Sequence, residues 1–325
     1  MRAVCAQTHV DQVSATIRKP TTLNLQQFLT TEFGTRLWMS LGHAVPPRLG
    51  HGIAAAVMAL VGRRRSARFY RILYANQAGV LGPDASPERV HAAVRAVLRH
   101  VGMTAYDLAH LASAGEAAFR EALDFGPDVW DAFSAARATG RGVMACGCHL
   151  SNFNLGFLAV AMRGVPVQVL SAAGTAGGFK LMKDLRSRGL LEDTPIDAST
   201  LRKAVQRLRQ GGVCATAADW VPAADPIELV PFFGRPARLP TGHIRLAISA
   251  NALLFPIAAR WDPQRGYYAI CAPTMELELT GDRATDVRHN ARRVLSVMER
   301  WIAQTPDQWL MHYRVWPEGA ANHVA

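Results

Sequence analysis

The stretch Gly142-Val143-Met144-Ala145-Cys146-Gly147-Cys148-His149-Leu150-Ser151-Asn152-Phe153-Asn154 decides the fold of this chain. Its first five residues predict a short buried strand, and the run Asn154–Met162 predicts a helix after an intervening turn. His149 lies in that turn. A polar side chain just after a buried strand lies at the carboxyl end of a sheet, where open α/β sheets place their functional sites. A single histidine is more often structural, so its surroundings have to decide its role.

The residues after this turn alternate between short apolar runs and helical patterns. Ser199–Gln210 predicts a helix with Ser199 as its N-cap and Gly211 as its stop. Strands that alternate with helices are typical of α/β proteins, so we predict a mixed, largely parallel sheet flanked by helices. The predicted strands are Gly142–Cys146, Val165–Leu170, Gly212–Ala217, Asn251–Ala259 and Tyr267–Cys271, and further helices are predicted at Gly178–Arg188 and His243–Ala250.

The first half of the chain is predicted to be helical. A helix start at Pro83–Pro87 is followed by valines and leucines at helical spacing. The apolar run Ile53–Val61 leads into the range 63–71, which carries five arginines. One interpretation of this amphipathic segment is a solvated helix face. The other is a membrane-docking region, in which arginines meet anionic headgroups and apolar side chains reach the acyl boundary.

The composition describes a globular protein with an excess of positive charge. Half of its 325 residues are hydrophobic and 19% are charged, which is enough to bury a large core and too apolar for disorder. The formal net charge of +11 predicts attraction to something anionic: nucleic acid, a lipid headgroup surface or a phosphate-bearing substrate. No nucleic-acid-binding module is recognisable, so we expect no nucleic-acid partner.

Targeting and cysteine patterns suggest a cytoplasmic protein that lies peripherally at the inner face of the cell membrane. Residues 1–29 mix polar and charged side chains, unlike a signal peptide. Pro46, Pro47 and Arg48 interrupt the longest apolar region, and the remaining run, Ile53–Val61, is far shorter than the roughly 20 residues that a spanning helix needs. The cysteines form no CxxC pair and predict reduced thiols; they are Cys5, Cys146, Cys148, Cys214 and Cys271.

Several blocks of the sequence, taken together, resemble the lysophospholipid acyltransferase superfamily. Within it, they resemble the bacterial lipid A lauroyl/myristoyl acyltransferases and the mycobacterial phosphatidylinositol mannoside acyltransferase. The family mark His-x4-Asp/Glu reads His149-x4-Asn154 here. The later blocks follow in the family's order: Gly211–Asp219, a strand ending in an acidic residue; Val230–Gly242; Leu254–Ile257; and Thr305–Arg314, which resembles a closing helix that contains Trp and Arg.

The likeness covers roughly residues 36–317 and implies a domain organisation. Residues 36–130 would form a helical region and 131–317 an α/β catalytic core of one acyltransferase domain. An N-terminal extension, 1–35, and a tail, 318–325, would flank it.

The resemblance implies direct acyl transfer from acyl-CoA or acyl-carrier protein to a hydroxyl or amine of a lipid, glycolipid or lipid-like acceptor. No cofactor other than this donor and no metal are expected. His149 would take the acceptor's proton as it attacks the thioester carbonyl, without a covalent acyl-enzyme. The implied substrate-binding residues are Phe232, Phe233, Gly234, Arg235, Arg238, Thr241, Gly242 and Arg188. The alternative is that the two phenylalanines are core aromatics and that Arg235 and Arg238 are solvated surface charges.

Asn154 departs from the family pattern, because an asparagine carries no charge to stabilise a protonated histidine. In serine proteases the corresponding change costs about 10⁴-fold in rate. Three interpretations stay open. Asp219 supplies the missing charge from a neighbouring strand end, or the acceptor is a stronger nucleophile such as an amine, or the site is catalytically weak. His149, Asn154 and Asp219 are therefore the catalytic candidates.

Other activities of the same fold remain as alternatives. An acyl-thioester hydrolase and a non-catalytic acyl-chain-binding protein would share these residues. A Cys–His nucleophile is a weaker alternative, because Cys148 and His149 are neighbours on an extended segment and point in opposite directions. His312 is expected to pack or to lie at the surface.

Overall fold

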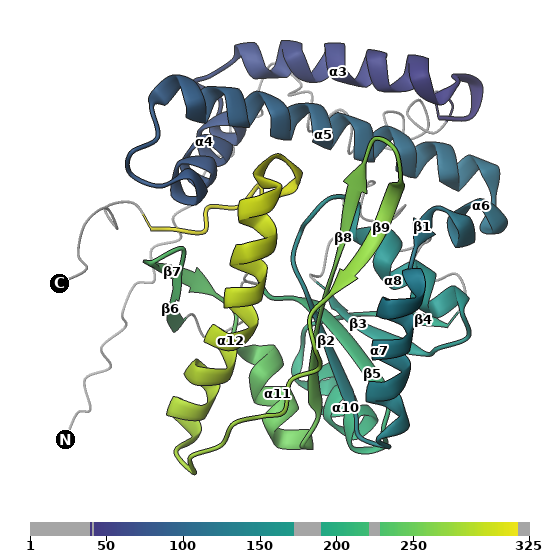
Figure 1. The fold of residues 1–325 in the computed structure, drawn as a ribbon, viewed down its shortest axis with the longest axis vertical. Helices are drawn as coiled ribbons and strands as arrows, with labels where there is room; N and C mark the ends of the chain where they lie inside the picture. Colours follow the sequence, from purple (N-terminus) through teal and green to yellow (C-terminus); the bar gives the residue numbers. More distant parts are fainter. Residues whose placement is uncertain (1–39, 41, 172–189, 221–227, 318–325) are drawn as a thin grey trace, which may run out of the picture.

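The structure is a computed structural model, and it describes residues 40, 42–171, 190–220 and 228–317 (Figure 1). The predicted helix Gly178–Arg188, the substrate-binding candidate Arg188 and the flanking segments 1–35 and 318–325 lie outside the described residues.

A seven-stranded sheet forms the centre of the molecule. Its order is β1-β9-β8-β2-β5-β3-β4, and every neighbouring pair is parallel except β8 and β9. The predicted mixed, largely parallel sheet flanked by helices is therefore confirmed. The strands are β1 (Leu123–Asp124), β2 (Val143–Gly147), β3 (Val167–Ser171), β4 (Leu191–Pro195), β5 (Val213–Ala217), β8 (Leu253–Asp262) and β9 (Gly266–Cys271).

Helices cover both faces of this sheet, which explains why β2 is buried along its entire length. Successive residues of a strand point to opposite faces. Val143 and Ala145 pack with α7 (Gly126–Ala138) and α8 (Phe153–Met162). Met144 and Cys146 pack in the other layer, with the helices α10 (Ala198–Arg209), α11 (Gly242–Ala250) and α12 (Arg283–Gln304).

Two local predictions were wrong in detail. The N-cap of α10 is Asp197 rather than Ser199, because the Asp197 carboxylate accepts the backbone N–H groups of Ser199 and Thr200 and so satisfies the free donors of the first turn. The C-terminal block is not a helix beyond its first residues. Pro306–Gln308 is a single 3₁₀ turn, and the chain from Trp309 onward is non-helical.

The N-terminal part of the described chain is helical, as α3 (Pro47–Arg63), α4 (Arg68–Leu81), α5 (Pro87–Ala114) and α6 (Glu116–Glu121). Figure 1 shows α3 and α5 side by side across the top of the molecule. Small residues permit this close approach, because a Cβ on Gly102 would lie 2.8 Å from Met58 Cγ. Among the described helices, none is both long and apolar enough to cross a bilayer.

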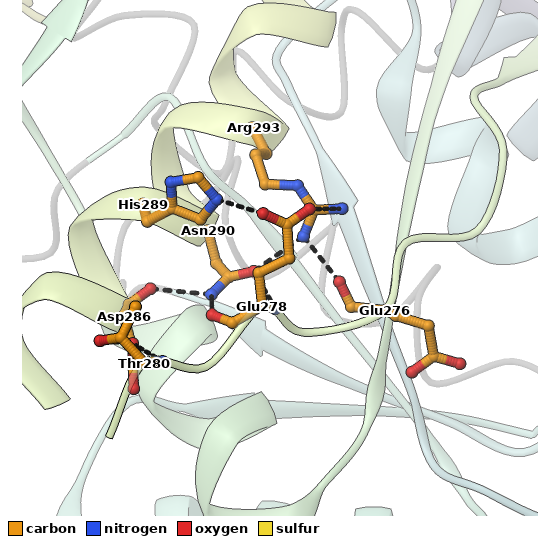
Figure 2. Close-up of polar contacts among 7 residues, drawn as sticks. All are labelled: Glu276, Glu278, Thr280, Asp286, His289, Asn290 and Arg293. Atoms are coloured by element: carbon orange, nitrogen blue, oxygen red, sulfur yellow. Dashed lines mark hydrogen bonds and ion pairs between the residues drawn. The ribbon is translucent and has the colours of Figure 1, made fainter. Parts of the chain in front are cut away.

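A polar network fixes the segment that leads into α12 (Figure 2). The Glu278 carboxylate pairs with His289 and with Arg293, 2.5 and 3.0 Å away. The Asn290 amide donates to the Glu278 backbone carbonyl, and Asp286 accepts the N–H and hydroxyl of Thr280. Most of this segment has no neighbouring strand. These hydrogen bonds therefore satisfy backbone groups that would otherwise be unpaired.

Candidate active site

His149 lies in the turn between β2 and α8, and the C-terminal segment holds this turn in place. The backbone N–H of Leu310 donates to the His149 carbonyl at 2.8 Å, and the N–H of Ser151 donates to the Gln308 carbonyl at 2.7 Å. Ser151 has a φ of 49°, an unfavourable value for a residue with a Cβ. Its hydroxyl is bonded to His100 Nε2 at 3.0 Å, so the turn is fixed from two sides.

Asp219 lies directly beside His149. The register of the sheet explains this, because Gly147 of β2 pairs with Ala217 of β5, and each candidate stands two residues further along its own chain. The Asp219 Oδ1 atom is 2.7 Å from His149 Nδ1, and Oδ2 accepts the His149 backbone N–H at 2.7 Å. This is the arrangement that the first interpretation of Asn154 requires.

The surroundings of Asp219 favour its charged form. Burial raises the pKa of this carboxyl. The nearby His149 and the N–H donors of His149 and Trp309 lower the pKa by more than burial raises it, so it lies below its usual value. A carboxylate can only accept hydrogen bonds, so the Nδ1–H of His149 donates to Asp219, and in the neutral imidazole Nε2 is the nitrogen that can take up a proton. The His149 side chain is 15% exposed, which leaves it accessible to a reactant.

The carboxylate that faces His149 Nδ1 comes from Asp219 and not from the x4 position of the family pattern, where this chain has Asn154. Asn154 is half-buried at the second residue of α8, whereas the Nδ1 position of His149 is held by Asp219. An asparagine at the x4 position is therefore compatible with a complete histidine–carboxylate pair.

An apolar cavity of about 40 Å³ lies between α8 and the sheet, and its lining includes Cys148, the residue before His149. Phe153 links the two features, since it lines the cavity and its ring centre is 4.5 Å from that of His149. The sheet contributes small side chains here, which is why space remains. They are Ala145, Gly147, Ala215, Ala258, Ala259 and Ala269.

The aromatic candidates of the third block lie in a hairpin, β6 (Glu228–Phe232) and β7 (Arg235–Leu239). Phe232 is fully buried against Trp309 and Trp316, whereas Phe233 and Gly234 form the turn, with φ of 51° and 68°. Phe232 thus has the packing of a core aromatic.

The polar candidates of this block are divided between surface and interior. The Arg235 guanidinium lies 5.4 Å from the Trp316 ring centre, and Arg238 is exposed. Thr241 is fully buried, and Gly242 is the first residue of α11.

Two residues near His149 were not among the predicted site residues. Trp309 reaches Asp219 through its indole nitrogen. His312 lies at the surface. Its pKa is lowered, mainly because neighbouring protein atoms keep water away from the ring and to a smaller extent because of His149. Both belong to the C-terminal block, and no local signal in the sequence tells that this block returns to the β2–α8 turn.

The cysteines of the turn are poorly suited to nucleophilic catalysis. Cys146 and Cys148 are buried, and burial raises the pKa of both thiols, that of Cys148 to well above its usual value with the added effect of Asp219. The thiolate that a nucleophile needs is therefore disfavoured.

The fold and this pair define an α/β protein with a buried carboxylate and a partly exposed histidine at the carboxyl ends of adjacent parallel strands. The family model for bacterial lipid A biosynthesis acyltransferases matches residues 16–317. The chain belongs to this family, and it is a lipid acyltransferase.

Among solved structures, the 1-acyl-sn-glycerophosphate acyltransferase PlsC from Thermotoga maritima is similar at 11% identity. The match covers 79% of this chain and 98% of that chain, with a TM-score of 0.35. A comparison with curated proteins gives no match.

Proposed function

We propose that the protein transfers a fatty acyl group from acyl-CoA or acyl-carrier protein to a hydroxyl or amine of a lipid or glycolipid acceptor, with His149 as general base. The observation that carries this proposal is the His149–Asp219 pair, which Phe153 connects to an apolar cavity. The pair supplies a base with a defined tautomer, and the cavity, which has room for only a few methylene groups, supplies an apolar contact for the start of the acyl chain.

The reaction follows from the orientation of the imidazole. Nδ1 is held by Asp219, so Nε2 takes the proton of the acceptor hydroxyl as the oxygen attacks the thioester carbonyl carbon. The new C–O bond forms, the C–S bond breaks, and His149 returns the proton to the leaving thiolate. The buried charge of Asp219 stabilises the imidazolium between these two steps.

The cavity supports the donor side of this proposal. Its lining is apolar, and Phe153 places one end of it against the His149 ring. The first methylene groups of an acyl chain, lying against Phe153 in this cavity, would bring the carbonyl carbon next to the base. The resulting near-attack position lowers the entropic cost of the transfer step.

The outer face of α3 supports membrane docking at the inner face of the cell membrane. Leu49, Ile53 and Leu60 are 63%, 46% and 59% exposed and lie on one side of the helix. Five exposed arginines follow in the range 63–71. Apolar side chains in one row, continued by basic ones, suit an interface with anionic lipid.

The substrate-binding proposal for the β6–β7 hairpin rests on its two arginines. Arg235 is half-buried and Arg238 is exposed, so both guanidinium groups are candidates for phosphate oxygens of the donor or the acceptor.

The test is an acyl-transfer assay on the full chain and on His149→Ala. Short-, medium- and long-chain acyl-CoA and acyl-carrier protein are offered with membrane lipids, lysophospholipids or phosphorylated glycolipids. Thiol release is followed alongside mass spectrometry of the lipid product. We expect acceptor-dependent product from the wild type and a loss of about 10²-fold to 10⁴-fold in His149→Ala.

Two results would contradict the proposal. Release of free fatty acid at the same rate without any acceptor would favour the hydrolase alternative. Unchanged transfer by His149→Ala would remove His149 as the base.

A further inference from the structure

We infer that Trp309 is a positioning residue for the His149–Asp219 pair, an inference that rests on the proposed function. Its indole Nε1–H donates to Asp219 Oδ2 at 2.9 Å. The same oxygen accepts the His149 backbone N–H, and Oδ1 faces His149 Nδ1. Donors from two distant parts of the chain thereby fix the plane of the carboxylate, and with it the plane of the imidazole.

The need for such a donor follows from the burial of Asp219. This residue is 1% exposed, so water does not solvate its charge. A buried carboxylate that lacks donors either rotates toward other partners or takes up a proton. A protonated Asp219 would no longer stabilise an imidazolium at His149, so the indole donor supports the charge on which the base depends.

The C-terminal segment is built to deliver this donor. Trp309 is 1% exposed and pairs with Leu150 in an isolated antiparallel bridge directly beside His149. Its ring packs against Phe232 and Trp316, each with ring centres 6.1 Å away. Packing and backbone pairing therefore fix the indole before any substrate binds.

Other titratable groups around Asp219 come from each neighbouring element. His149 and Cys148 face it from the turn after β2, and His312 does so from the C-terminal segment. Arg260 on β8 acts on Cys148. Removing the Trp309 donor leaves these groups in place, so a change in the pH profile of the variant reports on the coupled His149–Asp219 pair.

The test compares Trp309→Phe with Trp316→Phe. Both indoles are almost fully buried in the same aromatic cluster, but the Trp316 N–H donates to the Phe232 carbonyl instead of to Asp219. We expect Trp309→Phe to lower kcat by about 10-fold to 100-fold with little change in the donor KM. Because loss of the donor raises the pKa of Asp219, the acidic limb of the kcat/KM profile should move to higher pH. Trp316→Phe should leave the acidic limb in place.

A second variant covers the case in which Trp309→Phe does not fold. Site-specific replacement of Trp309 by its benzothiophene analogue keeps the bicyclic ring and substitutes sulfur for the N–H. The same loss of kcat and the same pH shift are expected. A folded variant with unchanged kcat and an unchanged acidic limb would overturn the inference. If His149→Ala is inactive at the same time, the proposed function stands without it.

Discussion

At the residue scale, the carboxylate of Asp219 accepts hydrogen bonds from two parts of the chain. Its oxygens face His149 Nδ1, the His149 backbone N–H and the Trp309 indole. This pattern explains how an asparagine can stand at position 154, because the charge that stabilises a protonated histidine comes from the neighbouring strand.

Two single substitutions, Asp219→Asn and Asn154→Asp, test separately what each of these residues contributes to turnover. We expect Asp219→Asn to lower kcat by as much as about 10⁴-fold, because an amide carries no charge and can leave the wrong histidine tautomer. Asn154→Asp should leave turnover unchanged or reduce it, because the Nδ1 position is already occupied. Both variants are compared in the acyl-transfer assay with a panel of acyl-CoA thioesters. A large increase in the Asn154→Asp variant would show that position 154 lacks a needed carboxylate.

At the element scale, α8 joins the base to the cavity. Phe153, its first residue, contacts the His149 ring, and Gly156 and Val160 line the cavity one and two turns later. The helix α8 therefore carries both the contact to the proposed base and part of the cavity proposed for the start of the acyl chain.

Gly156 offers a test of this coupling, because a Cβ built there meets no atom within 4 Å. We expect Gly156→Leu to fill part of the cavity and to shift the preferred donor toward shorter acyl chains, measured as kcat/KM across a series of acyl-CoA thioesters. Gly156→Ala is the control. It should change selectivity little, and it should raise the free energy of unfolding by up to about 1 kcal/mol, because alanine favours a helix interior. An unchanged preference in a folded Gly156→Leu variant would argue against an acyl site beneath α8.

At the scale of the whole molecule, the helices α3 and α5 lie side by side across the top (Figure 1), and Leu49 and Leu60 of α3 are exposed. The positive charge of the sequence is concentrated partly at the end of this helix, in the range 63–71. Exposed apolar and basic side chains therefore lie next to each other on a surface that does not pack against the core.

Binding to vesicles tests this surface. We expect Leu60→Glu to weaken binding to anionic phospholipid vesicles by about 10-fold, since it removes an apolar contact and adds repulsion. Leu279→Glu is the matched control, because Leu279 is similarly exposed, at 55% against 59%, in the segment before α12. Sedimentation with vesicles at low and high salt gives the measurement. Equal binding by both variants would contradict docking through α3.

The sequence by itself determined the local elements of this protein. Apolar runs with turn residues on both sides predicted β2, β3, β5, β8 and β9 to within about three residues, because buried strands leave a continuous apolar signal. The strands β1, β6 and β7 were not predicted. The edge strand β4 was not predicted, since its residues Leu191–Pro195 are half exposed and carry Glu, Asp and Thr. The capping carboxylate of Asp197 and the non-helical C-terminal segment were missed because propensity fixes helix ends poorly.

Only the tertiary structure decided which residues meet at His149. Spacing along the chain suggested Asn154 in the helix after the turn, and it left Asp219 as one of three open interpretations. The strand order β8-β2-β5-β3 brings Asp219 to His149 Nδ1. Strand order depends on how entire faces of the sheet are buried, and no short stretch of sequence carries that information. The same holds for Trp309, near the end of the described chain. It contacts Asp219 because the C-terminal segment pairs with the turn after β2.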